Sequence, residues 1–209
     1  VNPQGVDLSA LMTRPEKIAI VALGPSAQSF VRRQMSDVGV NSDYDEVWTL
    51  NRGIKGFHHD KLFVMDDLKW IENHRNKNYA DFLKNHDKPI ITSTPYFDYP
   101  TSIPFPLKEC IDFHDDDIFA VNTVSYMVAY ALYIGVKDMH IFGADFVYKN
   151  GTVVEEGAMA VSYMLGRCKM HDCIHTLTND TTLIYANKVQ QFADGGVGRE
   201  PYGYHRVRE

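Results

Sequence analysis

Glycine, proline and serine follow an apolar run in the segment "KIAIVALGPSAQSF", residues 17–30, and they are the first residues whose types suit a binding site. Gly24 permits a tight turn, Pro25 fixes the backbone at the start of a helix, and Ser26 is a favoured helix cap. The first amides of a helix lack partners within it and attract anions. We therefore expect a phosphate site at this turn; the alternative is an ordinary strand-to-helix cap.

The glycine spacing excludes two common nucleotide motifs. Gly24 is not followed by glycines at the spacing that admits a dinucleotide pyrophosphate, and no Gly-Lys-Ser/Thr of a P-loop follows it. A second helix start is predicted at "NTVS", where Asn122 is the cap and Thr123 and Ser125 lie in the first turn. Two helix starts that face one crevice suit a nucleotide phosphate.

Two more polar segments offer ligand-binding side chains. Asn51 and the adjacent Arg52 suit a base, a ribose hydroxyl or a sugar, and their alternative is a turn in Asn-Arg-Gly. Asp66 and Asp67 suit a divalent cation or a ribose diol, and their alternative is the capped start of a helix. The sequence leaves these alternatives open.

These residues need elements to position them, and short apolar runs alternate with helical patterns along the chain. Such alternation indicates parallel strands joined by right-handed crossovers. We predict one α/β domain over residues 1–209, Rossmann-like, with a mostly parallel sheet flanked by helices. The expected strands are 18–23, 46–51, 61–67, 88–94, 138–146 and one near 173–177. The expected helices are 26–38, one or two within 68–85, 122–135 and about 157–170.

The carboxyl ends of the expected strands carry the candidate residues, because ligands of open parallel sheets bind there. The fourth strand ends in Thr92 and Ser93, and the fifth in Gly143 and Asp145, so these four join the predicted nucleotide-binding set. Region 95–117 holds four prolines and is expected to be a long loop across one sheet edge, able to act as a lid. Residues 1–15 and 195–209 are expected to be an N-terminal extension and a C-terminal tail.

Composition narrows the class of protein. The net charge of the 209 residues is -6, which disfavours coating of nucleic acid through overall charge, although the tail combines arginines with tyrosines and could form a local patch. Three cysteines without a CxxC spacing fit neither a disulfide framework nor a zinc knuckle, and they favour the cytoplasm. No apolar run is long enough to predict a membrane span. The oligomeric state is not predicted.

The motifs "LGPS", "LNRG" and "NTVSYMVAYALYIGVKDMHIFGADFVY" resemble those of a group of Rossmann-like families. The group includes the bacterial sialyltransferases of glycosyltransferase family 42, the motility accessory factors and the archaeal 6-hydroxymethylpterin diphosphokinase-like proteins. The resemblance covers roughly residues 17–148. The compact form is also similar to phage-encoded proteins of this group, which would place the chain in a host cytoplasm.

The resemblance to the sialyltransferases implies a nucleotide-sugar donor of CMP or UDP type and no obligatory cofactor. It places Gly24, Ser26 and Asn51 near the phosphate or sugar and Asn122, Thr123 and Ser125 at the nucleotide. It also implies that Gly143 and Asp145 lie by the base and ribose and that Tyr148 reaches the leaving phosphate. The general base would be His171 or His175.

The expected activity is therefore transfer of a sugar to an acceptor hydroxyl, on a modified DNA base or a glycan. One alternative is a Mg²⁺-dependent diphosphokinase, in which Asp66 and Asp67 hold the metal near the phosphates. Another is a module that binds a nucleotide without catalysis. A requirement for metal would separate the first alternative from the sugar transferase.

Overall fold

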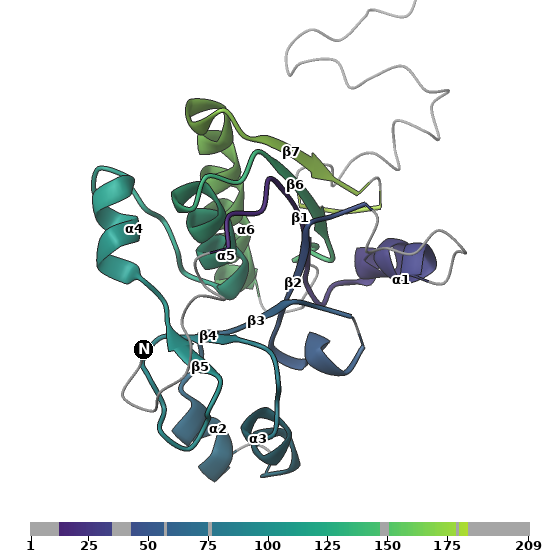
Figure 1. The fold of residues 1–209 in the computed structure, drawn as a ribbon. Coiled ribbons are helices and arrows are strands. Elements are labelled where there is room, and N and C mark those ends of the chain that lie inside the picture. The colour runs from purple at the N-terminus through teal and green to yellow at the C-terminus, as the bar shows by residue number, and fades with distance from the viewer. Residues whose placement is uncertain are drawn as a thin grey trace, which may run out of the picture.

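In the computed structural model of the chain, seven parallel strands form one sheet within the described residues (Figure 1). The structure describes residues 13–34, 43–56, 58–74, 77–146, 151–178 and 180–183, with the backbone alone at 54, 55 and 151–154. The strand order is β5-β4-β3-β2-β1-β6-β7. The strands are β1 (Lys17–Val21), β2 (Glu46–Leu50), β3 (Lys61–Val64), β4 (Ile90–Thr92), β5 (Ser102–Pro104), β6 (Asp138–Phe142) and β7 (Ile174–Leu177).

Helices cover both faces of the sheet, as Figure 1 shows for α5 and α6 on one side and α1 on the other. The first face carries α4 (Leu107–Phe113), α5 (Thr123–Tyr133) and α6 (Gly151–Gly166). The second carries α1 (Gln28–Gln34), α2 (Leu68–His74) and α3 (Lys77–Lys84). Three short 3-10 helices complete the set: η2 (Pro25–Ala27), η4 (Asn51–Lys55) and η5 (Arg167–His171).

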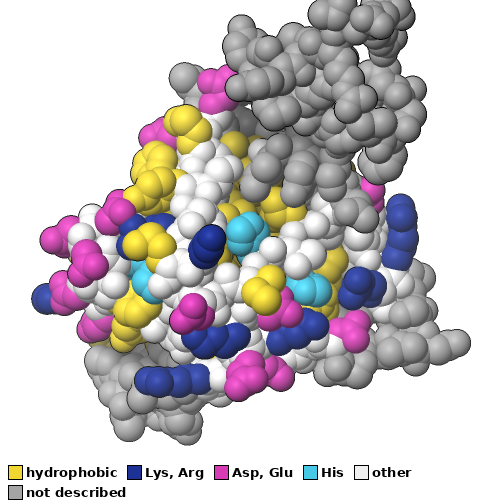
Figure 2. Space-filling view, turned by 90° about the horizontal axis from the view of Figure 1, so that it is seen from above, with side chains coloured by type: hydrophobic (Ala, Val, Ile, Leu, Met, Phe, Trp, Pro, Cys, Tyr) yellow, Lys and Arg dark blue, Asp and Glu magenta, His cyan; other side chains and the backbone are white. Residues whose placement is uncertain are grey.

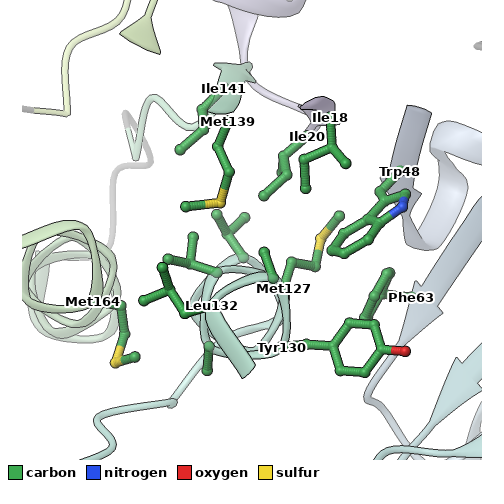
Figure 3. Packing of buried hydrophobic residues seen from close by; sticks show 14 of the residues in the cluster. Ile18, Ile20, Trp48, Phe63, Met127, Tyr130, Leu132, Met139, Ile141 and Met164 are labelled. Carbon is green, nitrogen blue, oxygen red and sulfur yellow. The ribbon is translucent and has the colours of Figure 1, made fainter. Parts of the chain in front are cut away.

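Burial on both faces explains why the strand sequences are almost continuously apolar. Ile18 and Ile20 of β1 face α5, whereas the intervening Ala19 and Val21 face α1. The larger core lies around α5, which packs against the sheet with α6 beside it (Figure 3). The residues labelled there are Ile18, Ile20, Trp48, Phe63, Met127, Tyr130, Leu132, Met139, Ile141 and Met164.

The order of the strands creates a switch point beside β1. The chain builds β2, β3, β4 and β5 outward on one side of β1 and then returns to place β6 on the other side. Crossovers that diverge in this way leave a crevice at the carboxyl ends of the diverging strands. The turns after β1, β2 and β6 border that crevice, so the fold fixes where a ligand site can form.

The predicted fold class is confirmed, whereas the prediction for region 95–117 is wrong. That region contains β5 and α4, and β5 pairs in parallel with β4 at the sheet edge. Pro104 is the last residue of this edge strand, a position that needs no amide for the ladder. The region is therefore part of the framework and not a long lid-like loop.

Some expected boundaries also shift. Strand β6 ends at Phe142, four residues before the predicted limit, because Gly143 turns the chain with a φ of 73°. Helix α6 begins at Gly151 and not near residue 157. Residues 1–12 of the predicted extension and the predicted tail 195–209 lie outside the described residues. Among the described helices, none combines the length and apolar character needed to cross a bilayer.

Candidate functional site

Two neighbouring pockets lie at the switch point, and we call them the first and second lobes of the cleft. The first lobe has a volume of about 190 Å³ and the second about 160 Å³, and both are lined by Leu23 and Asn51. The first is also lined by Ala22, Leu50, Asn122, Thr123, Val124, Gly143, Ala144, Asp145 and Phe146. The second is also lined by Arg52, Asp66, Ile71 and Tyr79. Residues from the ends of β1, β2, β3 and β6 thus meet in one place, as the parallel topology requires.

Asn51 lines both lobes and has two unusual properties. Its φ is 47°, in the left-handed region that asparagine tolerates better than most residues. Its side-chain Oδ1 is buried, and no partner is found for it among the described residues. A buried acceptor without a donor costs free energy that a bound donor can recover. The geometry therefore makes Asn51 a strong candidate for direct ligand contact.

The start of α5 supplies the polar wall of the first lobe. Asn122 caps the helix: its Oδ1 accepts from the Ser125 amide at 2.9 Å, and its Nδ2 donates to the Gly157 carbonyl at 2.9 Å. Asn122 and Ser125 therefore position the helix start with side-chain groups that already have partners. The amides of Thr123 and Val124 belong to the first turn, where no carbonyl lies one turn earlier to receive them. Both residues line the lobe, so these amides suit an anion there.

The predicted phosphate site at Gly24-Pro25-Ser26 is occupied by the protein's own carboxylate. Asp145 is 4% exposed, and its Oδ2 accepts from the Ser26 amide at 2.7 Å. Its Oδ1 accepts from the Thr182 amide at 3.3 Å. The Ser26 hydroxyl in turn accepts from the Gly143 amide at 2.9 Å. The turn after β1 is thus held internally, and Asp145 acts first as a positioning residue.

Close approach between two turns explains both glycines. A Cβ on Gly24 would lie 2.4 Å from Asp145 Oδ2 and 2.5 Å from the Gly143 carbonyl oxygen. A Cβ on Gly143 would lie 2.5 Å from the Ala22 carbonyl oxygen. The predicted use of Gly24, a tight turn, is not the reason for the glycine, because its φ is -73°.

The second lobe combines charges of both signs with a phenol. Arg52 and Asp66 are exposed at its rim, and Tyr79 is buried. Burial raises the pKa of Tyr79, the charge of Asp66 raises it further and that of Arg52 opposes the rise. This wall suits a polar group with several hydroxyls, which can donate to the carboxylate and accept from the guanidinium.

Asp67 caps a helix and does not line the cleft. Its Oδ1 accepts from the Lys69 amide at 2.8 Å and caps α2, which is the alternative that the sequence left open. The described residues contain no group of three side chains arranged to hold a metal ion. Asp67 is therefore engaged as a helix cap, and among the described residues no third ligating side chain joins Asp66 and Asp67.

The two histidines predicted as general base are not brought to the cleft. His175 pairs in register with Met139, near the amino end of β6. His171 lies beyond that end: its carbonyl accepts from Lys137 Nζ at 3.4 Å, and its ring stacks on Phe113 at 4.8 Å. Burial lowers the pKa of both histidines. Parallel strands place these residues at the edge opposite to the cleft, so the catalytic role predicted for them is corrected. Tyr148, the third predicted catalytic residue, lies outside the described residues.

Three more predicted residues lie away from the lobes. Thr92 is fully buried, and its hydroxyl donates to the Thr94 carbonyl at 2.7 Å; Ser93 is exposed. Thr92 ends β4 and Ser93 follows it, two strands beyond β2, so they do not reach the switch point. Pro25 is exposed at the first position of η2, where a missing amide costs nothing.

Sequence reasoning missed several lining residues. Phe146 has a φ of 50° and borders the first lobe, and Tyr79 reaches the second lobe from α3. No local signal marks either residue, because an aromatic side chain in such a pattern is usually core. Leu23 had a signal: it is an apolar residue directly before a glycine turn at a strand end, and it is 43% exposed.

Comparisons with known proteins give remote structural likenesses. No protein-family profile and no curated protein matches the chain. The sialyltransferase CstII from Campylobacter jejuni, solved with cytidine-5'-monophosphate, is 18% identical over 80% of this chain and 82% of that chain, with a TM-score of 0.48. An α-2,3-sialyltransferase from the same organism, in apo form, is 17% identical over 80% and 77%, with a TM-score of 0.46. Each TM-score is below 0.5, so we base no site assignment on them.

Proposed function

We propose that the chain is a nucleotide-sugar-dependent glycosyltransferase that moves a sugar to an acceptor hydroxyl. A nucleotide sugar has a nucleotide half and a sugar half joined by phosphate, and the cleft has two neighbouring lobes that Asn51 lines in common. In this proposal the first lobe takes the nucleotide, with the phosphate at the amides of Thr123 and Val124. The second lobe takes the sugar between Arg52 and Asp66.

The observation that carries the proposal is the buried Oδ1 of Asn51, which has no partner among the described residues. It lies at the junction where the phosphate and the sugar hydroxyls of such a donor would pass. The first-turn amides stabilise negative charge on the departing nucleotide without a metal ion. CMP-type and UDP-type donors both fit this description, and we propose no obligatory cofactor.

The acceptor is proposed as a hydroxyl of a glycan in preference to a modified DNA base. Among the described residues of the face in Figure 2, acidic and basic side chains lie side by side, and a phosphate backbone would favour a uniformly basic surface. The buried free thiols of Cys110, Cys168 and Cys173 agree with the reducing cytoplasm that we propose as the setting.

The test is thermal unfolding of the whole chain with CMP, UDP, ADP, ATP, CMP-N-acetylneuraminate and three UDP-hexoses, each with and without Mg²⁺. A ligand at 100 times its Kd raises the free energy of unfolding by about 2.7 kcal/mol. We expect a shift with a cytidine or uridine compound that survives a chelator. A shift that needs ATP and Mg²⁺ together would support the diphosphokinase instead. A bound nucleotide sugar that stays intact on long incubation with acceptors would support the non-catalytic module.

Asn51→Gly tests the residue itself, because glycine keeps the left-handed backbone and removes only the amide. We expect the Kd of the stabilising nucleotide sugar to rise at least about tenfold, the loss of one hydrogen bond, while the unfolding midpoint without ligand stays unchanged. Asn51→Asp is the matched control: it keeps the shape but adds a negative charge beside the phosphate, so it should weaken binding further. Unchanged affinity in both variants would contradict the proposal.

A further inference from the structure

Transfer of a sugar to an alcohol needs a group that takes the proton from the acceptor hydroxyl. This requirement rests on the proposed function. No histidine lines either lobe among the described residues. The carboxylates that line the lobes there are those of Asp145 and Asp66.

Asp145 is unsuited to accept this proton. Each of its oxygens accepts an amide hydrogen, from Ser26 at 2.7 Å and from Thr182 at 3.3 Å. The side chain is buried, and a Cβ on Gly24 would already contact it. Protonation would require those bonds to weaken, so Asp145 holds the turn in place and does not exchange protons with a ligand.

Asp66 has the opposite properties. It is exposed, it lines the second lobe, and no hydrogen bond to its carboxylate joins it to another described residue. Its charge acts on the phenol of Tyr79 in the same lobe. The carboxylate is therefore available to a ligand in this lobe.

The register of the sheet sets Asp66 beside the proposed sugar position. Leu50 pairs with Phe63, so the chain leaves β2 at Asn51 and leaves β3 just before Met65 and Asp66, at the same edge of the sheet. Neighbouring parallel strands lie about 4.8 Å apart. A sugar whose phosphate lies in the first lobe and whose ring passes Asn51 thus reaches the lobe that contains Asp66.

We propose that Asp66 is the general base of the transfer. An acceptor hydroxyl gives its proton to the Asp66 carboxylate while its oxygen forms the new bond to the anomeric carbon. The bond from that carbon to the phosphate oxygen breaks, and its electron pair leaves with the nucleotide phosphate at the start of α5. The proton on Asp66 then passes to solvent, to which the residue is exposed.

The experiment compares Asp66→Asn with Asp67→Asn, a matched removal of one negative charge at the neighbouring residue, which lines neither lobe. Release of CMP or UDP is followed for the nucleotide sugar that most stabilises the wild-type chain, with lactose or water as acceptor. A positioned base contributes about 10²–10⁴-fold in rate. We expect kcat to fall at least about 100-fold in Asp66→Asn, the Kd of the free nucleotide to stay unchanged, and Asp67→Asn to turn over normally. Added formate should restore part of the rate to Asp66→Gly.

Each other outcome is decisive. If Asp66→Asn releases nucleotide as fast as Asp67→Asn, Asp66 is not the base, although the glycosyltransferase proposal stands. If the Kd of the nucleotide rises as much as kcat falls, Asp66 is a binding residue and the inference is wrong. If the wild-type chain binds no nucleotide at all, the proposed function fails, and that result is visible before any variant is measured.

Discussion

The two ends of the same sheet use polar side chains in opposite ways. At the amino end, Glu46 accepts from Trp48 Nε1 at 2.6 Å and from the Thr13 hydroxyl at 2.6 Å, and it forms an ion pair with the buried Lys61. Asp45 accepts the amides of Glu16 and Lys17, each at 2.8 Å. These polar groups have partners within the chain, and they fix where β1, β2 and β3 begin.

At the carboxyl end, one buried polar group that lines the cleft has no protein partner among the described residues. This group is the Oδ1 of Asn51, and Thr123 and Val124 of the first turn of α5 line the same lobe. Asp145 is the exception, because it holds the turn after β1. The difference teaches that one end of this sheet stabilises the fold and the other is available to a ligand. Three changes test that separation, in order of decreasing effect.

The largest effect is expected from Lys61→Met at the amino end. It leaves the Glu46 carboxylate, 11% exposed, without its ion-pair partner, and breaking a buried pair costs about 3–5 kcal/mol. Burial already lowers the pKa of Lys61 even with Glu46 beside it, which shows how strongly the site is desolvated. Urea unfolding measures the loss, and the double variant Lys61→Met/Glu46→Gln should recover most of it. Nucleotide affinity below the unfolding transition should be unchanged; a parallel fall in affinity would contradict the separation of the two ends.

A smaller effect is expected from Gly24→Ala at the carboxyl end. The new methyl group would meet Asp145 Oδ2 and the Gly143 carbonyl oxygen, and overpacking of this kind costs about 1–3 kcal/mol. The free energy of unfolding and the nucleotide affinity should both fall, because the methyl group displaces the turns beside the first lobe. Gly166→Ala in α6 is the control: nothing lies within 4 Å of its added Cβ, so it should stabilise the chain by up to about 1 kcal/mol. Equal effects of the two substitutions would show that the close approach does not matter.

The smallest effect on the free energy of unfolding is expected from a fall in pH. At the amino end, His59 and His86 place their Nε2 atoms 3.2 Å apart, and burial, together with the charge of His59, lowers the pKa of His86 below its ordinary 6.5. The His86 ring therefore binds a proton more readily in the unfolded chain than in the folded chain. Its contribution to the free energy of unfolding is complete above about pH 6.5 and is lost as the pH falls below that value. One such group changes the free energy of unfolding by less than about 1.4 kcal/mol per pH unit. Unfolding midpoints between pH 7.5 and 5.5 should fall more steeply for the wild-type chain than for His86→Gln. Equal slopes for the wild-type chain and His86→Gln would show that the pair of histidines does not contribute to this pH dependence.

The fold was largely predictable because apolar runs and glycine turns are local signals. The strand predicted at 18–23 lies at Lys17–Val21, and the cap predicted at Asn122 is present; both follow from local residues. The segment around Pro104 was misread because prolines argue against a strand, whereas an edge strand tolerates one at its end. That distinction depends on which strand is the neighbour, and no local pattern shows it.

The sequence predicts the features of the candidate site that depend on strand order. It does not predict which residues hydrogen-bond to one another. Parallel topology brings Asn51, Asn122 and Asp145 to one end of the sheet, as the sequence led us to expect. It could not show that the carboxylate of Asp145 takes the Ser26 amide, a contact between residues 119 positions apart. Nor could it exclude His175, because a histidine's place at one end of a strand or the other depends on register.

The central position of β1 in the sheet has a consequence for the order in which the chain folds. Its neighbour β6 arrives only after four other strands and their crossovers have been laid down, so the walls of the cleft are distant in the chain. Contacts of such long sequence separation close slowly, and they are gained late in refolding. We expect a chain that ends before β6 to retain much of the second lobe's framework but to lack the pairing that completes the first. Ligand binding during refolding would then report the final step of assembly and would follow, not accelerate, the earlier ones.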